Sequence, residues 1–242
     1  FVADMGVDSA IGGLGWAWLP FMLTSYDQVD EYYINGWIND ELTKQYADNG
    51  LIRVAPTENC FRECGNVKRP INSMADMTGL KIRVPETQAC QDFYTALGAI
   101  PAAIATSETL AALEQGTVDG VDNSIYNMKS MGVLEKIKYI TMLNYMYSGA
   151  SITCSEEFWN SMTANQQAAF KQAADEAGAF FRENMRADEQ TILDQGSFEV
   201  EEIDPSSDFY KQMKEKAVEL WAGYASEYPS DIMDRINQDF SV

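Results

Sequence analysis

The chain has 242 residues, of which 37 are Asp or Glu and 17 are Lys or Arg, so its formal net charge is −20, and it contains no histidine. Without histidine there is no Ser-His-Asp or Cys-His nucleophile, no histidine-ligated zinc and no imidazole pH switch. Such an acidic chain also repels polyanions, which excludes nucleic acid as a partner.

Hydrophobic residues make up 46% of the chain, enough for a sizeable core in one large domain or two small ones. No stretch is long and apolar enough to cross a membrane; the most apolar opening stretch, 11–23, is short and typical of buried core. We therefore expect a protein that is not itself membrane-embedded. The chain begins at Phe1 without an initiator Met or a signal-peptide pattern, so we expect that an upstream segment has been removed.

Four cysteines, at positions 60, 64, 90 and 154, form no CxxC pair and, without histidine, make a poor metal site. On one extended strand Cys60 and Cys64 would lie about 13 Å apart, beyond disulfide reach. Two interpretations stay open: a Cys64–Cys90 bridge in an oxidising compartment, or buried free thiols. No metal or other cofactor is expected.

The hydrophobic pattern alternates between strand-like and helix-like segments. A helix is expected over 25–49, continuous or broken near Gly36, because Ser25 and Gln28 form a capping-box pattern and Gly50 offers a stop. The segments that follow are strand 51–55, strand 80–84, helix 87–97, strand 99–104, helix 107–115 and strand 118–121. This order favours an α/β fold with mostly parallel sheets, in which ligands gather beyond the carboxyl ends of the strands.

The second half of the chain changes character. The segments expected there are strands 137–142 and 150–154, a long helix over 163–195, a half-exposed strand over 198–203, a helix over 208–228 and a short C-terminal helix after Pro229. The long helix carries an apolar stripe that includes Phe170, Phe181 and Ile192, the period of a core-facing amphipathic helix.

Basic residues are scarce, yet four of them fall within 68–83. Alternation along Leu80-Lys81-Ile82-Arg83-Val84 puts Lys81 and Arg83 on one face, and Arg83 lies at the carboxyl end of the expected strand. A guanidinium there can hold a carboxylate through two parallel hydrogen bonds, which lysine cannot copy. The alternative is a structural salt bridge with one of the many acidic residues.

Three ordered motifs carry a resemblance to a known family. GLKIRVP (79–85), LGAIPAAI (97–104) and ETLAALEQGTVDGVDNSI (108–125) resemble the solute-binding proteins of tripartite ATP-independent periplasmic (TRAP) transporters, of the dicarboxylate-binding type. The likeness covers nearly the whole chain. It implies a two-domain α/β periplasmic binding protein of class II type, with crossover strands, a long connecting helix and a ligand cleft between the domains.

The resemblance also implies site residues. Arg83 matches the family arginine that pairs with the substrate carboxylate, and Asn123 matches a ligand-binding asparagine, although Asp122 stands here where Glu is usual and Ser124 where Pro is usual. Arg62 matches an arginine that in some members makes a second ligand contact; the family commonly has Gly where this chain has Cys60. Two arginines lean slightly toward a dicarboxylate or a sugar acid.

Aromatic side chains are further candidates. Trp18, Tyr126 and Tyr145, together with Trp16 and Tyr147, could form apolar walls of a cleft for an organic acid, although core packing is the alternative for each of them.

The implied domains are 1–59 plus 149–187 for the first and 60–148 plus 188–242 for the second. Proteins of this type normally begin with two more strand-helix units, so we expect a longer natural chain with a signal peptide. The implied function is capture of a small organic acid in the periplasm and delivery to membrane-embedded TRAP permease subunits, without catalysis. Two alternatives remain: an enzyme that uses paired carboxylates, or a ligand sensor that has lost the transporter.

Overall fold

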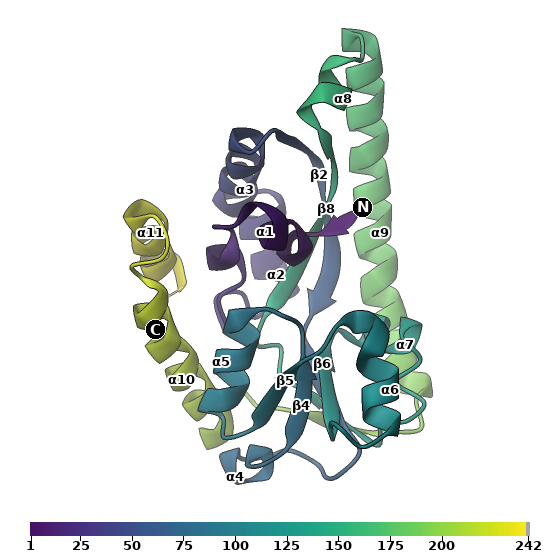
Figure 1. Ribbon diagram of the computed structural model, residues 1–242, viewed down its shortest axis with the longest axis vertical. Coiled ribbons are helices and arrows are strands. Elements are labelled where there is room, and N and C mark those ends of the chain that lie inside the picture. The colour runs from purple at the N-terminus through teal and green to yellow at the C-terminus, as the bar shows by residue number, and fades with distance from the viewer. Residues whose placement is uncertain (241–242) are drawn as a thin grey trace.

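The computed structural model describes residues 1–240, which form two β-sheets with helices packed around them (Figure 1). The elements in chain order are β1 (Val2–Ala3), α1 (Asp4–Ile11), η1 (Gly15–Trp18), α2 (Tyr26–Gln28), η2 (Val29–Ile34), α3 (Trp37–Asp48), β2 (Leu51–Phe61), β3 (Glu63–Asn66), α4 (Met74–Met77), β4 (Lys81–Val84), α5 (Gln88–Ala96), β5 (Ile100–Ala103), η3 (Thr106–Glu108), α6 (Thr109–Glu114), β6 (Gly120–Asn123), α7 (Ile125–Ser130), β7 (Tyr139–Met142), β8 (Tyr147–Ser155), α8 (Glu156–Asn160), α9 (Ala164–Gln195), β9 (Glu199–Glu202), α10 (Asp208–Tyr224) and α11 (Ser230–Phe240).

The larger sheet has the strand order β5-β4-β6-β3-β7-β9. Its pairings are parallel except for the two that β3 makes, so five of its six strands within residues 1–240 run in one direction. The α/β class and a mostly parallel sheet are therefore confirmed for this sheet. Because β4 and β6 are parallel neighbours, their carboxyl ends bring Arg83 and Asn123 to the same edge.

The smaller sheet is antiparallel, with the order β1-β8-β2. Its strand β2 runs for 11 residues, twice the length expected from the sequence, and includes Pro56. A proline lacks the N–H that a central strand needs, and β2 accommodates it because it pairs only with β8 in the described part of the chain.

Two strand connections pass from one sheet to the other. β2 of the smaller sheet leads through the single residue Arg62 into β3 of the larger sheet, and β7 leads back through residues 143–146 into β8. The long helix α9 lies along β2 and reaches α7 beside the larger sheet (Figure 1). Crossover strands and a long connecting helix are thus both present.

The largest buried cluster draws on both parts of the molecule. It joins Tyr33 and Trp37 beside the smaller sheet to Ile82 and Phe93 of the larger sheet. The C-terminal helices cover this cluster. The Trp221 indole of α10 donates to the Pro20 carbonyl at 2.9 Å. Phe240 of α11 packs against Tyr32. Helices α10 and α11 therefore both contact the first forty residues, and α10 also packs against α5. The expected division into two domains stays a prediction.

Several expected elements differ in detail. The helix expected over 25–49 is broken at Gly36, whose backbone is extended where α3 begins. A Cβ at this position would clash with the backbone of Glu31 and Tyr32, so the break requires glycine. Only half of its capping box forms: Ser25 accepts from the Gln28 N–H, whereas the Gln28 side chain accepts from Thr24.

The remaining helices and strands follow the expected order. The long helix α9 begins after a complete capping box at Thr163 and ends at the expected Gln195, whereas α10 ends at Tyr224, four residues early. The sequence does not predict elements β1, α1, η1, β3, α4, α7 and α8. In the described residues no helix is both long and apolar enough to cross a membrane.

Candidate functional site

A cavity of about 480 Å³ opens where the carboxyl ends of β4 and β6 face helix α1 and the crossing between β2 and β3. Its lining residues are Ala3, Met5, Gly6, Ser9, Asn59, Arg62, Arg83, Pro85, Glu86, Thr87, Ile104, Ala105, Thr106, Asn123, Asn127, Ser130, Met131 and Ser148. The cavity therefore collects residues from both sheets, and three of the predicted site residues, Arg62, Arg83 and Asn123, lie together in its wall.

Arg83 lies at the end of β4 and is only 1% exposed. Its Nε donates to the Ile104 carbonyl at 2.8 Å and its Nη2 reaches the Thr106 hydroxyl at 3.4 Å. Within residues 1–240 no carboxylate lies within ion-pair distance of it. Burial, and next the charge of Arg62, lower the pKa of Arg83 to about 10, and the opposing charges of Asp122 and Glu86 do not offset them. The guanidinium therefore remains charged at neutral pH.

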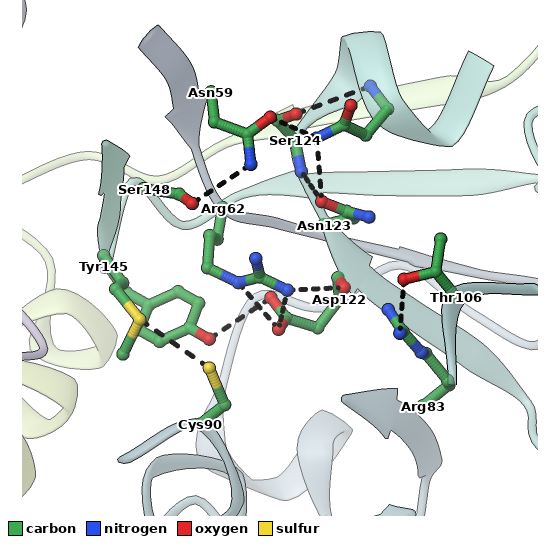
Figure 2. Close-up of polar contacts among 12 residues, drawn as sticks. Asn59, Arg62, Arg83, Cys90, Thr106, Asp122, Asn123, Ser124, Tyr145 and Ser148 are labelled. Carbon is green, nitrogen blue, oxygen red and sulfur yellow. Dashed lines mark hydrogen bonds and ion pairs between the residues drawn. The ribbon is translucent and has the colours of Figure 1, made fainter. Parts of the chain in front are cut away.

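Arg62 is the residue between β2 and β3, and a carboxylate holds it firmly. Its Nη2 lies 2.7 Å and its Nε 3.0 Å from Oδ2 of Asp122, and Nη2 also donates to the Asp122 carbonyl at 2.9 Å. Burial opposes the charge of Arg62, but Asp122, together with Cys90 and Tyr145, outweighs the effect of burial, and the pKa of Arg62 is raised. Tyr145 donates to the other carboxylate oxygen of Asp122 at 3.2 Å, so Asp122 is held from two sides (Figure 2).

A chain of neutral polar side chains lines the opposite side of the cavity. Asn127 of α7 donates to Asn59 at 2.7 Å and to Asn123 at 3.3 Å, and Asn59 donates to Ser148 at 3.2 Å (Figure 2). The Asn123 amide oxygen also accepts from the Ser124 N–H at 2.9 Å. Each amide offers donors and acceptors, which suits hydroxyl groups. Asn59, Asn127 and Ser148 were not predicted, since partners 68 and 89 residues apart leave no local sequence pattern.

The backbone next to Asn59, near the end of β2, is irregular. Cys60 has a φ of 62°, in the left-handed region that favours glycine. The register with β8 shifts between Glu58 and Phe61, so two residues of β2 face one of β8. This bulge lies beside Asn59 and close to Arg62, two residues of the cavity wall.

The three predicted aromatic residues do not line the cavity. Trp18 is buried in the main core and borders a neighbouring cavity of about 190 Å³, which shares Met5, Ser9, Glu86 and Thr87 with the first. Tyr126 packs against the core of the larger sheet. Tyr145 is fully buried and stacks on Phe93, with ring centroids 4.2 Å apart. All three side chains pack in or against a hydrophobic core, and Tyr145 also contacts the site through Asp122, so their role in ligand binding stays a prediction.

All four cysteines are free thiols, and Cys60, Cys64 and Cys90 are buried. This answers the open question about a Cys64–Cys90 bridge in favour of free thiols. Among the described residues, no group of three or more acidic or cysteine side chains is arranged to hold a metal ion.

Buried carboxyl groups lie near the crossing between the sheets, outside the cavity. Glu63 of β3 accepts from the Asn144 N–H at 3.0 Å through one oxygen, while its other oxygen has no hydrogen-bond partner in the part of the chain that the structure describes. Burial raises the pKa of Glu63 well above 4.5. Glu189 of α9 accepts from Tyr26 at 2.7 Å, and burial raises its pKa too. These acids add no counter-charge to Arg83.

A polar cavity with a buried, uncompensated arginine, set between two sheets that are joined by crossing strands, defines a solute-binding protein of the α/β type. The chain belongs to family 7 of the bacterial extracellular solute-binding proteins, the DctP family, whose profile matches residues 13–227. The resemblance drawn from the three motifs is therefore confirmed.

Known proteins of this family resemble the chain at moderate identity. A solute-binding protein of Roseobacter denitrificans is 30% identical over 166 residues, which cover 68% of this chain and 50% of that protein. The C4-dicarboxylate-binding periplasmic protein DctP of Rhodobacter capsulatus is 26% identical over 189 residues, 76% of this chain and 56% of that protein. The chain thus spans about half the length of the curated relatives it matches.

A solved structure shares the fold over the full chain. The TRAP periplasmic solute-binding protein of Polaromonas sp. JS666, bound to D-erythronate, superposes with a TM-score of 0.83 at 27% identity, covering 100% of this chain and 78% of that protein.

Proposed function

We propose that this protein captures a small organic acid in the cavity and delivers it, in the periplasm, to the membrane-embedded permease subunits of a TRAP transporter. The observation that carries the proposal is Arg83: a buried, charged guanidinium at the cavity wall with no carboxylate partner among residues 1–240. Burying a charge without a partner is costly, and a ligand carboxylate would supply the missing counter-charge.

The geometry assigns a role to each neighbouring group. Arg83 would donate paired hydrogen bonds to the carboxylate, since among residues 1–240 its Nη1 has no hydrogen-bond partner and its Nη2 contacts only Thr106, at 3.4 Å. Arg62, Asn123 and the amides of Asn59 and Asn127 would bind the remaining polar atoms. The names of two relatives support a carboxylate ligand: one is described as a C4-dicarboxylate-binding protein, and another holds D-erythronate.

Closure around the ligand would follow from the way the sheets are connected. Arg62 lies at one strand crossing and Ser148 just beyond the other, so a ligand that contacts both residues would bridge the connections between the two sheets. A ligand that binds the closed form more tightly than the open form shifts the population toward closure. The work of the site is capture and hinge motion, with no catalytic step.

A thermal-shift screen of the wild-type protein against a panel of carboxylates tests this function. A ligand at a hundred times its dissociation constant stabilises the folded state by about 2.7 kcal/mol, a readily measured shift. Arg83→Ala should abolish the shift, whereas Lys81→Ala, which removes the same charge from the exposed start of the same strand, should retain it. No shift with any carboxylate, or equal shifts in both variants, would refute the proposal.

A further inference from the structure

Two buried acids lie on the connections between the sheets. Within residues 1–240 these connections are the β2–β3 crossing at Arg62, the β7–β8 crossing over 143–146, and the long helix α9, which leads from the smaller sheet to β9 of the larger one (Figure 1). Glu63, the first residue of β3, is 0% exposed, and Glu189 of α9 is 7% exposed. A hinge motion between the sheets therefore changes the surroundings of both carboxyl groups.

Each acid is bonded to a segment on another connection or on the other side of the hinge. One oxygen of Glu63 accepts from the Asn144 N–H at 3.0 Å, so the first strand crossing is tied to the second. One oxygen of Glu189 accepts from the Tyr26 hydroxyl at 2.7 Å. The Tyr26 ring packs on Phe61 at the end of β2, with ring centroids 5.1 Å apart. The two acids thus link α9, α2 and both strand crossings.

Neither acid has a cation to balance its charge. The second oxygen of each has no hydrogen-bond partner, and no Lys or Arg in the described residues pairs with either. The nearest arginines are already paired: Arg186 lies 2.8 Å from Glu58 and 2.7 Å from Asp30, and Arg62 pairs with Asp122. The titratable groups that act on the two acids are Tyr26, Glu58, Cys60, Cys64 and Asp122, and the charged groups next to these are Asp30, Arg62, Arg182 and Arg186.

The cavity is described in its closed arrangement, with its two sides in contact. Asn127 of α7, which packs beside the larger sheet, donates to Asn59 of the smaller sheet at 2.7 Å. In this arrangement burial raises the pKa of Glu63 and of Glu189, and their hydrogen bonds do not offset it. Opening the cavity would separate the sheets at the crossings and admit water to both carboxyl groups, which favours their ionised forms.

We propose that Glu63 and Glu189 form a proton-sensitive hinge: they take up protons from the solvent when a bound acid closes the cavity and return them when it opens, so affinity rises as pH falls. The inference rests on the proposed function and adds a regulation of its site. Below about pH 4.5 both states hold the protons, and above the raised pKa values neither state does, so the effect lies between these limits. Within them, each proton taken up changes the affinity by up to about tenfold per pH unit.

The absence of histidine makes this linkage measurable. Histidine is the side chain that ordinarily titrates between about pH 5 and 8, and this chain has none. The probes are D-erythronate, D-gluconate, D-galacturonate and pyruvate, whose carboxyl groups stay ionised above about pH 5.5, and the tightest binder is used. Calorimetric titration in bis-Tris and in Tris at one pH near 7 gives the number of protons taken up, because the two buffers differ in ionisation enthalpy and neither is an anion that could compete.

We expect the wild-type protein to take up protons on binding, and its affinity to fall by about tenfold or more between about pH 5.5 and 8.5. In Glu63→Gln/Glu189→Gln both side chains are neutral at every pH and still accept from Asn144 and Tyr26. This double variant should change its affinity by less than about threefold over the same range, and should bind more tightly than the wild type at the upper end. Glu183→Gln makes the same substitution at an exposed position of α9 and should keep the wild-type pH dependence.

The double variant keeps every other titratable group, including the Phe1 amine, Asp8 and Glu58, so its difference from the wild type reports on the two acids alone. A wild-type affinity that is constant with pH and shows no proton uptake overturns the inference. So does a double variant that keeps the wild-type pH dependence. If the double variant does not fold by circular dichroism, the wild-type uptake and the two single variants decide.

Failure of the proposed function gives a different result. If none of the four probes binds but another carboxylate of the thermal-shift panel does, that acid replaces them, with its own proton release subtracted, and the same outcomes decide. Binding of no carboxylate at all overturns the proposed function and the hinge inference with it.

Discussion

Replacing Arg83 with methionine should move stability and binding in opposite directions. Methionine keeps most of the length of the side chain and removes its charge. The pKa of Arg83 is about 10 in the folded protein against 12.5 for an ordinary arginine, and a depression of this size corresponds to a cost of about 3 kcal/mol for holding the charge. Because a base with a lowered folded-state pKa is charged in both states below that pKa, the full cost applies at neutral pH and fades only as pH rises from about 10 to 12.5.

Removing the charge should relieve this cost, but losing the hydrogen bond to the Ile104 carbonyl lowers the unfolding free energy by about 1 kcal/mol. Arg83→Met should therefore raise the unfolding free energy of the ligand-free protein by about 1–2 kcal/mol, or its melting temperature by about 2–8 °C. The same change should weaken carboxylate binding roughly a hundredfold or more, because it removes a charge-assisted, paired contact.

Urea denaturation and calorimetric titration measure the two effects on the same samples. A ligand-binding arginine is maintained at the expense of stability, whereas a structural salt bridge is not. Arg83→Met that loses stability and keeps its affinity would refute this reasoning and restore the structural salt-bridge interpretation of Arg83.

Two further predictions concern buried acids outside the cavity. Asp4 is fully buried, accepts from Tyr46 at 2.5 Å and from Ser151 at 2.8 Å, and pairs with buried Arg53. Asp4→Ala should therefore lower the unfolding free energy by about 3–5 kcal/mol in urea denaturation, whereas the exposed control Asp188→Ala should change it by less than about 0.5 kcal/mol. A small effect of Asp4→Ala would mean that Arg53 finds another partner. The pKa of Glu63 lies well above 4.5 in the folded protein, so the folded state keeps this proton to higher pH than the unfolded state, and stability falls as pH rises above 4.5. Glu63→Gln should therefore be more stable than the wild type at pH 8 and similar to it near pH 4.5. A variant that is less stable than the wild type at pH 8 would contradict the raised pKa.

The central site residue could be predicted from the sequence because its position depends on local rules. Alternation along a short strand places Arg83, and a parallel sheet places the ends of its strands together, so Arg83 and Asn123 meet at one edge. The family motifs added Arg62, which lies outside any regular pattern because it occupies the single residue between two strands.

The rest of the site depends on contacts that no local pattern encodes. Asp122 differs from the usual family residue, and its pairing with Arg62 joins residues 60 positions apart. The amide chain through Asn59 depends on a bulge at Cys60, a residue type that rarely adopts a positive φ. Aromatic residues in strand-end loops are equally consistent with a cleft wall and with a hydrophobic core, and Trp18 and Tyr145 are buried in the core.

The sequence also left the balance of charge unresolved. A net charge of −20 is unfavourable for binding an anionic ligand, since the electrostatic field of the whole molecule should repel the ligand. The structure places two of the 17 basic residues, Arg62 and Arg83, in the cavity wall, where burial shields their interaction with a ligand from salt. In the proposed function, this local positive charge holds the small acid despite the negative net charge of the protein.

A crystal structure of the protein with a bound carboxylate from the panel tests the central claim most directly. We expect the two carboxylate oxygens to lie about 2.7–2.9 Å from the guanidinium nitrogens of Arg83, with the remaining polar atoms of the ligand on Arg62 and the amides of Asn59, Asn123 and Asn127. A ligand whose carboxylate lies away from Arg83, or that occupies another cavity, would contradict the account.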